Sequence, residues 1–155
     1  MTTNPTGLLD RVTVEPMTYW DLEQVTAIER ASFHRPWQPG GFRTELERKP
    51  ARCLVVRDGS TILGYLIFWH IPPEIHILNI AVKPDYRGQG LARLLMDYMF
   101  EYGRETGIEE IFLEVRPSNQ EAQALYERTG FLVVGHRKNY YSEDNEDAIL
   151  MTRRL

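Results

Sequence analysis

Hydrophobic and polar residues along this chain alternate in patterns typical of both strands and helices. Several short apolar runs are bounded by Gly, Pro and charged residues, and such runs indicate β-strands. Gly59-Ser60 separates two of these runs, which predicts a hairpin turn. The predicted strands are residues 12–16, 52–58, 61–71, 74–82, 108–115, 131–141 and 147–155, and the last two are expected to pair antiparallel.

Two helices are predicted in the first third of the chain. Thr18 and Asp21 have the spacing of a capping box, which marks the start of a helix. The segment "HRPWQPGG" interrupts this helix at residues 34–41, and residues 42–48 are predicted as a second, short helix. The apolar stripe expected on the first helix consists of Leu22, Val25, Ile28 and Ala31.

Two further helices are predicted in the second half of the chain. The third ends at Gly107, and the fourth starts at a second capping box, formed by Ser118 and Glu121, and ends at Gly130. The third helix carries a long apolar stripe of Leu91, Leu94, Leu95, Tyr98, Met99 and Tyr102.

The order of these elements, β-α-α-β-β-β-α-β-α-β-β, predicts an α/β fold with helices on a mixed sheet. The chain has 155 residues, which is enough for one domain with its own core and too short for two ordinary domains. We expect a flexible N-terminal arm at residues 1–10 and a single domain at residues 11–155.

Composition and charge narrow the possible functions. The formal net charge is −4, so direct nucleic-acid binding is not expected. No apolar run reaches the ~18 residues of a membrane span, and residues 1–16 lack the apolar segment of a signal peptide. We therefore expect a cytoplasmic protein without membrane contact. Cys53 is the single cysteine, and the histidines show no metal-ligand spacing, so neither an intrachain disulfide nor a metal is expected.

The segment "KPDYRGQGLA" joins an apolar strand to the third helix. The first N–H groups of a helix lack intrahelical partners and carry the positive end of its dipole. Gly88 and Gly90 remove side chains from their path, and Arg87 adds positive charge, as in an anion-binding loop. The segment lacks the Gly-Lys-Ser/Thr ending of a P-loop and the third glycine of the dinucleotide fingerprint. Taken alone, it also fits an ordinary strand-to-helix turn.

Arg87-x-x-Gly90-x-Ala92 after "ILNIAV" resembles the pyrophosphate-binding motif of the GCN5-related N-acetyltransferases, the GNAT superfamily. The element order of nearly the whole chain is also similar to that family's. The resemblance implies a single-domain GNAT fold with a mixed, mostly antiparallel sheet, and acetyl-CoA as co-substrate without a metal. The backbone of residues 80–82 would then pair with the pantetheine arm. The residues that this resemblance places at the cofactor are Ile80, Ala81, Val82, Arg87, Gly88, Gln89, Gly90, Leu91, Ala92 and Arg93.

A second signature is more specific. "LEVRPSNQEAQALYERTGF" at residues 113–131, with "RKNYY" and "EDAILM" further on, resembles the RimI branch, the bacterial ribosomal-protein alanine N-acetyltransferases. The resemblance implies that Glu114 is the general base, that Tyr126 is the general acid and that Asn119 binds the pantetheine amide. The implied reaction is direct acetylation of the N-terminal alanine of a ribosomal protein.

The chemistry suits these residue types. An α-amine with a reference pKa near 7.8 costs only about 1 kcal/mol to neutralise at pH 7, whereas a lysine side chain costs about 4–5 kcal/mol. A carboxylate working through a water could therefore deprotonate an α-ammonium, and a phenol could protonate the departing thiolate. A backbone N–H from residues 80–82 could stabilise the negative charge that develops on the thioester oxygen.

Several roles stay open at this stage. Glu114 could instead be a salt-bridging carboxylate, and Tyr126 could pack its ring in the core. His76 shares a strand face with Leu78 and Ile80, at a position where other GNAT branches carry a base glutamate. It is a second candidate base, a water-relay member or an ordinary hydrogen-bonded histidine.

Other residues are expected on the acceptor side. Glu74 and His76 could face the acceptor peptide, and Tyr140 and Tyr141 could grip its N-terminus or be ordinary strand aromatics. Trp37 could contact the acceptor or plug the core. The acidic run at residues 142–147 is expected to be a solvated hairpin tip, and the alternative is that it contacts a basic residue of the acceptor peptide.

Three functions are compatible with these motifs. The first is the protein N-terminal acetyltransferase, the second a GNAT enzyme for a small-molecule amine or a lysine side chain, and the third a coenzyme A-binding module without turnover. The cofactor motif does not separate them, because the fold hosts many acceptors. The full "NYY…EDAILM" hairpin favours the first, and Glu114 with Tyr126 argues against the third. The sequence leaves the oligomeric state open.

Overall fold

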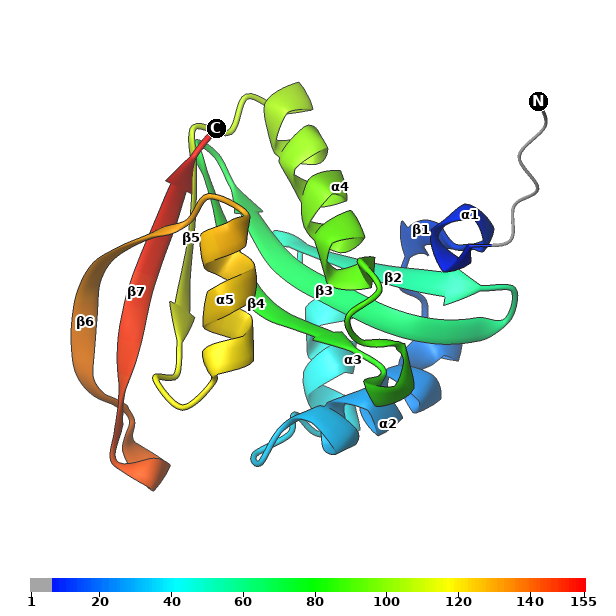
Figure 1. The fold of residues 1–155 in the computed structure, drawn as a ribbon, viewed down its shortest axis with the longest axis horizontal. Coiled ribbons are helices and arrows are strands. Elements are labelled where there is room, and N and C mark those ends of the chain that lie inside the picture. The colour runs from blue at the N-terminus through cyan, green and yellow to red at the C-terminus, as the bar shows by residue number, and fades with distance from the viewer. Residues whose placement is uncertain (1–6) are drawn as a thin grey trace. The chain divides into compact units, whose positions relative to one another are not determined.

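The computed structural model describes residues 7–155, so residues 1–6 of the expected arm lie outside the described residues. Every helix and strand predicted from the sequence is present within this range. The elements, labelled in Figure 1, are α1 (Leu8–Arg11), β1 (Thr13–Pro16), α2 (Leu22–Ser32), α3 (Pro39–Glu47), β2 (Ala51–Asp58), β3 (Thr61–Ile71), β4 (Glu74–Val82), α4 (Leu91–Glu105), β5 (Glu110–Val115), α5 (Gln120–Arg128), β6 (Leu132–Tyr141) and β7 (Glu146–Arg154).

Within residues 7–155, the strands form one mixed sheet of seven in the order β1-β2-β3-β4-β5-β7-β6. β4 and β5 are parallel, and their register runs from Glu74 opposite Glu110 to His76 opposite Phe112. The pairs β1–β2, β5–β7 and β6–β7 are antiparallel. The expected α/β fold with a mixed, mostly antiparallel sheet is confirmed.

The described residues divide into two compact units, and β3, β4 and α4 each contribute residues to both. The described part of unit 1 is residues 7–67 and 79–98, with α1, α2, α3, β1 and β2. Its core is apolar, and each large side chain removed from water contributes about 1.5–3 kcal/mol. The most deeply buried side chains of this unit include Val25, Phe42, Val55, Tyr65, Leu66 and Leu95.

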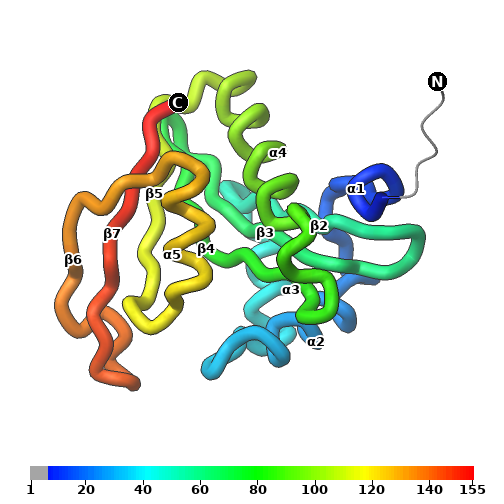
Figure 2. The backbone as a smooth tube through the Cα atoms, in the orientation of Figure 1, coloured from blue at the N-terminus to red at the C-terminus, as the bar shows by residue number. Residues whose placement is uncertain are grey.

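Unit 2 comprises Phe68–Leu78 and Met99–Leu155. Figure 2 traces its chain from β5 through α5 into the long β6–β7 hairpin. β6 is an edge strand and is exposed along most of its length. The core of this unit therefore lies against the other strands, and its buried side chains include Ile75, Met99, Phe100, Ile111, Leu113, Phe131 and Met151.

The starts of two helices, α3 and α5, differ from the sequence prediction. α3 starts at Pro39 rather than residue 42, because proline at the first helical position has a preset φ and needs no N–H acceptor. The predicted capping box of Ser118 and Glu121 is wrong. Asn119 caps α5 instead, and its Oδ1 accepts a hydrogen bond of 3.1 Å from the N–H of Ala122.

The expected N-terminal arm contains a structured segment. Leu8, Leu9 and Asp10 belong to the short helix α1. The side chain of Leu9 lies beside Gly90, where an added Cβ would come within 3.4 Å of its Cδ1. This end of the chain therefore borders the loop before α4.

The capping box of Thr18 and Asp21 is confirmed, with a 2.9 Å hydrogen bond from the Thr18 N–H to Asp21 Oδ2. The apolar stripe predicted for α2 is wrong at its end, because Ala31 is exposed and Glu29 is buried in the unit's interior. On α4, Tyr98 is likewise exposed. A stripe defined by hydrophobic residues alone does not include a buried charged residue such as Glu29 on the same helix face.

No helix among residues 7–155 is long and apolar enough to cross a membrane.

Candidate active site

The loop between β4 and α4 lies in unit 1. Gly88 and Gly90 have φ values of 74° and 89°, in the left-handed region that favours glycine. The loop is exposed, and an added Cβ at Gly88 would find no atom within 4 Å. α4 begins directly afterwards at Leu91, so the N–H groups of its first turn have no intrahelical acceptor. An open glycine loop at a helix start fits the pyrophosphate of coenzyme A.

The two arginines expected at this loop have protein partners. Arg87 donates from Nε to the carbonyl oxygen of Val82 at 3.0 Å and from Nη2 to Ser32 Oγ at 2.8 Å. These bonds connect the loop to the end of β4 and to α2, and they hold the positive charge of Arg87 beside the glycines. Arg93 pairs with Asp97 one turn further along α4, at 3.0 Å.

The other residues expected at the cofactor differ in exposure. Gln89 is exposed, Ala92 is half-buried, and Leu91 is buried, so its backbone alone is available to a ligand. At the end of β4, the N–H of Lys83 donates to the carbonyl oxygen of Leu63 at 2.7 Å, which joins this end to β3. In the preceding strand residues, Ile80 is half-buried, and Ala81 and Val82 are buried.

In unit 2, Glu114 on β5 bonds to His76 on β4. Their closest atoms, Oε2 and Nε2, lie 2.5 Å apart, and the two side chains are only 13% and 18% exposed. The imidazole stacks on Phe112 with ring centroids 4.4 Å apart and meets Trp69 edge-on at 5.9 Å. These aromatic rings hold the imidazole plane, and with it the hydrogen bond to Glu114.

The strand alternation explains this placement. Ile75, Ile77 and Asn79 are buried, whereas the alternating residues His76, Leu78 and Ile80 are half-buried. The prediction that these three share a strand face is confirmed. An ionised carboxylate offers about four lone-pair positions, so one bond to His76 leaves Glu114 able to accept a further proton donor. Glu74 is exposed two residues before His76 and lies opposite Glu110.

Tyr126 on α5 is buried, and its ring packs against Phe131 with centroids 5.6 Å apart. This is the core position that the sequence left open as the alternative to a general acid. Burial raises the pKa of Tyr126 well above its ordinary value, and the nearby Tyr141 raises it further. The phenol therefore keeps its proton at neutral pH and can act as a hydrogen-bond donor.

Tyr140 and Tyr141 lie at the end of β6, with their rings edge-on at 5.0 Å. Tyr140 is exposed and Tyr141 is half-buried. Burial raises the pKa of Tyr141 to about 12, the Arg116 guanidinium opposes this, and the charge of Glu114 adds to the rise.

The comparisons with known proteins agree with this geometry. The model of the acetyltransferase (GNAT) family matches residues 22–131. This chain belongs to the GNAT family. The resemblance noted in the sequence, the GNAT fold and the class of N-acetyltransferase enzymes are thereby confirmed.

Two curated relatives of this GNAT protein match nearly its whole length. A putative [ribosomal protein bS18]-alanine N-acetyltransferase of Bacillus subtilis is 39% identical over 91% of this chain and 94% of its own. N-alpha-acetyltransferase RimI of Mycobacterium tuberculosis is 34% identical over 92% of both chains. Among solved structures, the ribosomal-protein-S18-alanine N-acetyltransferase from Escherichia coli has a TM-score of 0.84 at 31% identity, covering 93% of this chain and 94% of that one.

Arg116, which no sequence motif singled out, organises the hairpin of this GNAT protein. Arg116 Nη1 lies 2.8 Å from Asp144 Oδ2 and 3.2 Å from Glu146 Oε1. The expectation of a solvated acidic tip at residues 142–147 is therefore wrong for these two carboxylates. The available signal was a basic residue two positions after Glu114, together with an acidic run in the hairpin.

A buried carboxylate in unit 1 was also missed. Glu29 is 1% exposed and accepts hydrogen bonds from the hydroxyl of Tyr65, from Asn79 Nδ2 at 2.8 Å and from the N–H of Trp37 at 2.8 Å. Burial, followed by the charge of Glu29, raises the pKa of Tyr65. An acidic residue one turn from Val25 on an otherwise apolar helix face was the signal in the sequence.

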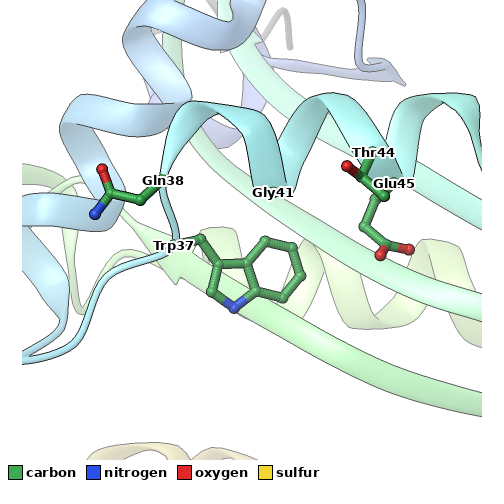
Figure 3. Close-up of a pocket in the computed structure, with 5 residues that line it drawn as sticks. All are labelled: Trp37, Gln38, Gly41, Thr44 and Glu45. Carbon is green, nitrogen blue, oxygen red and sulfur yellow. The ribbon is translucent and has the colours of Figure 1, made fainter.

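Trp37 borders a pocket beside α3 (Figure 3). The pocket has a volume of about 380 Å³ and is lined by Trp37, Gln38, Gly41, Thr44 and Glu45. Figure 3 shows the indole ring alongside the turn that carries Gly41. The ring also packs on Phe42, with centroids 5.1 Å apart. Trp37 therefore both plugs this part of unit 1 and forms a wall of the pocket.

Proposed function

We propose that this GNAT enzyme transfers the acetyl group of acetyl-CoA to the α-amine of an N-terminal alanine on a ribosomal protein. The single observation that carries the proposal is the Glu114–His76 pair, which holds a carboxylate ready to accept a proton. The names of the relatives at 33–39% identity supply the acceptor class. Such an acceptor implies a cytoplasmic location.

Binding of acetyl-CoA is assigned to the open loop and the strand before it. The N–H groups of residues 88–93 would bind the pyrophosphate, and Arg87 would contribute charge from its braced position. The backbone of Ile80, Ala81 and Val82 would pair with the pantetheine arm, and Asn119 would hold its amide. When bound, the co-substrate supplies an activated acetyl thioester.

Glu114 removes the proton from the acceptor's α-ammonium, directly or through one water. Deprotonating an α-ammonium at pH 7 costs about 1 kcal/mol, so an ordinary carboxylate suffices as the base. His76 donates to Glu114 and fixes the orientation of its carboxylate. No covalent bond between enzyme and substrate is needed.

Tyr126 retains its proton and provides it, or a hydrogen bond, to the departing thiolate. A backbone N–H of the residues 80–82 segment stabilises the developing charge on the thioester oxygen. Tyr140 and Tyr141 contact the acceptor's first residues, and Glu74 borders the same peptide.

The test is an acetylation assay read by mass on three acceptors. These are a short peptide beginning with alanine, the same peptide with a blocked N-terminus and an internal lysine, and a free polyamine. We expect acetyl incorporation on the free alanine peptide alone, and a decline when the first residue is enlarged. Incorporation confined to the lysine or the polyamine, or to none of the three, would contradict the proposal.

A further inference from the structure

In the β6–β7 hairpin of unit 2, β7 contributes buried side chains to the core, whereas β6 contributes almost none. Nearly every residue of β6 is exposed, and the pairing with β7 is irregular between Arg137 and Tyr141. Asn139 and Asn145 both have a φ of 52° within this segment. Hydrophobic burial alone therefore gives this part of the hairpin little support.

Charged side chains provide the missing support. The Arg116 guanidinium binds Asp144 at 2.8 Å and Glu146 at 3.2 Å, and its carbon lies 4.0 Å from the centroid of the Tyr141 ring. One arginine thus contacts three residues of the hairpin. A guanidinium suits this task because it is planar, always charged and able to stack on an aromatic face.

The hairpin also reaches back to the turn before α5. Glu146 Oε2 accepts a 2.7 Å hydrogen bond from the N–H of Ser118. Hydrogen bonds from Ser118 and from Arg116 hold the pKa of Glu146 below its ordinary value. Gln123 Nε2 in turn donates to the carbonyl oxygen of Arg116 at 3.1 Å, which fixes the turn from the side of α5.

These contacts connect the strand that carries Glu114, the candidate base, to Tyr141, the residue proposed to contact the acceptor. Arg116 follows Glu114 by two residues, and Tyr141 stacks on Arg116. The turn of Arg116 and Ser118 comes directly after the strand that carries the base and directly before the helix that carries Tyr126. A shift of the hairpin would therefore move Tyr141 relative to Glu114.

We propose that Arg116 is a positioning residue for the acceptor. With Asp144, Glu146 and the Ser118 N–H it forms a hairpin clamp that holds Tyr141 where the acceptor's N-terminus binds. The inference rests on the proposed function, because it assumes a peptide acceptor beside Tyr141. Arg116 itself would touch neither the reacting amine nor the thioester.

The first test is steady-state kinetics of Arg116→Gln, which removes the charge. We expect the KM for an alanine-initiated peptide to rise about tenfold, because a charged hydrogen-bond partner of the hairpin is lost. We expect kcat to fall by less than about threefold and the coenzyme A affinity, measured by calorimetry, to stay unchanged. Arg116→Lys keeps the positive charge but lacks the planar, multi-donor guanidinium, and it is expected to restore the KM only partly. Arg104→Gln, which breaks an exposed ion pair with Glu101 at 3.6 Å, is the matched control.

Salt provides a readout that a merely structural role would not give. The clamp is 20–30% exposed at Arg116, Asp144 and Glu146, so added salt should screen it. The peptide KM of the wild type is expected to rise with salt, whereas the KM of Arg116→Gln is expected to be high and nearly independent of salt. A wild-type KM that does not depend on salt would overturn the proposal.

Hydrogen exchange separates failure of the clamp from failure of the proposed function. Amides of residues 137–146 are expected to exchange faster in Arg116→Gln and at the wild-type rate in Arg104→Gln. Unchanged exchange, or a fall in kcat at constant KM, would overturn the clamp even in an enzyme that acetylates the peptide. If Arg116→Gln does not fold, Asp144→Asn with Glu146→Gln gives the same readouts. A wild type that acetylates no peptide while Arg116→Gln still loosens the hairpin would refute the proposed function instead.

Discussion

Glu29 in unit 1 and Glu114 in unit 2 are the same chemical group in opposite surroundings. Glu29 is sealed from water and accepts hydrogen bonds from Tyr65, Asn79 and the Trp37 backbone. Glu114 keeps some exposure and has one recorded partner among the described side chains, His76.

The comparison shows that the burial of a carboxylate and the number of its hydrogen-bond partners separate a structural role from a catalytic one. A carboxylate buried with donors on several sides is stabilised as a charge and holds its neighbours in place. A carboxylate on a half-exposed strand face, held from one side by an imidazole, retains capacity for a proton from outside. On this basis Glu29 holds neighbouring groups in place in its unit, and the surroundings of Glu114 are compatible with the base role that we propose for it.

The largest expected effect is the loss of activity when the carboxylate of Glu114 is removed. Glu114→Gln should lower kcat about thousandfold, within the range for loss of a general base. The free energy of unfolding should change by less than about 1 kcal/mol, because the amide still accepts a bond from His76. Thiol release from acetyl-CoA measures the rate, and urea unfolding measures stability. A variant that keeps the wild-type rate would remove Glu114 from the mechanism.

The next largest expected effect is the loss of stability when the buried carboxylate of Glu29 is removed. Glu29→Leu should lower the free energy of unfolding by about 3 kcal/mol, since it leaves the donors of Tyr65, Asn79 and Trp37 unsatisfied. Glu29→Gln, which retains an acceptor, should cost about 1 kcal/mol. Urea unfolding of both variants checks the values. Full stability with lost activity would reverse the contrast and place Glu29 in the chemistry.

A smaller effect is expected at the candidate acid. Tyr126→Phe should lower kcat about thirtyfold, because the thiolate then departs without a proton donor. Since burial raises the pKa of Tyr126 above the value near 10 of an unfolded chain, its contribution to stability is complete below about pH 10 and declines above it. The wild-type rate should accordingly show no alkaline loss from Tyr126 below about pH 10. An alkaline limb near pH 8 that disappears in Tyr126→Phe would contradict this assignment.

The smallest effect is expected at the partner of Glu114. His76→Gln preserves a hydrogen-bond donor to the carboxylate but removes the imidazole, and we expect kcat/KM to fall about tenfold or less. A pH profile from about pH 5.5 to pH 9 distinguishes the roles. An unchanged profile shape would show that His76 orients Glu114. Loss of an acid limb would show that His76 takes part in proton transfer.

Local patterns in the sequence predicted much of the fold. Alternation placed His76 on one strand face with Leu78 and Ile80, and the glycines at 88 and 90 marked an open loop before α4. Helix ends were less well predicted at Pro39 and Ser118. At Ser118 the structure uses the neighbouring Asn119 as the cap, because several polar residues in a row can serve equally well until tertiary contacts select one.

The amino-acid sequence by itself determined the order of strands and helices, the glycine loop and the GNAT family, because these depend on spacing along the chain. Only the tertiary structure decided which partners the charged groups acquire. Glu114 meets His76, Glu29 meets Tyr65, and Arg116 meets Asp144 across 38, 36 and 28 positions of sequence. Such contacts follow from sheet register and packing of distant segments, which no local periodicity encodes.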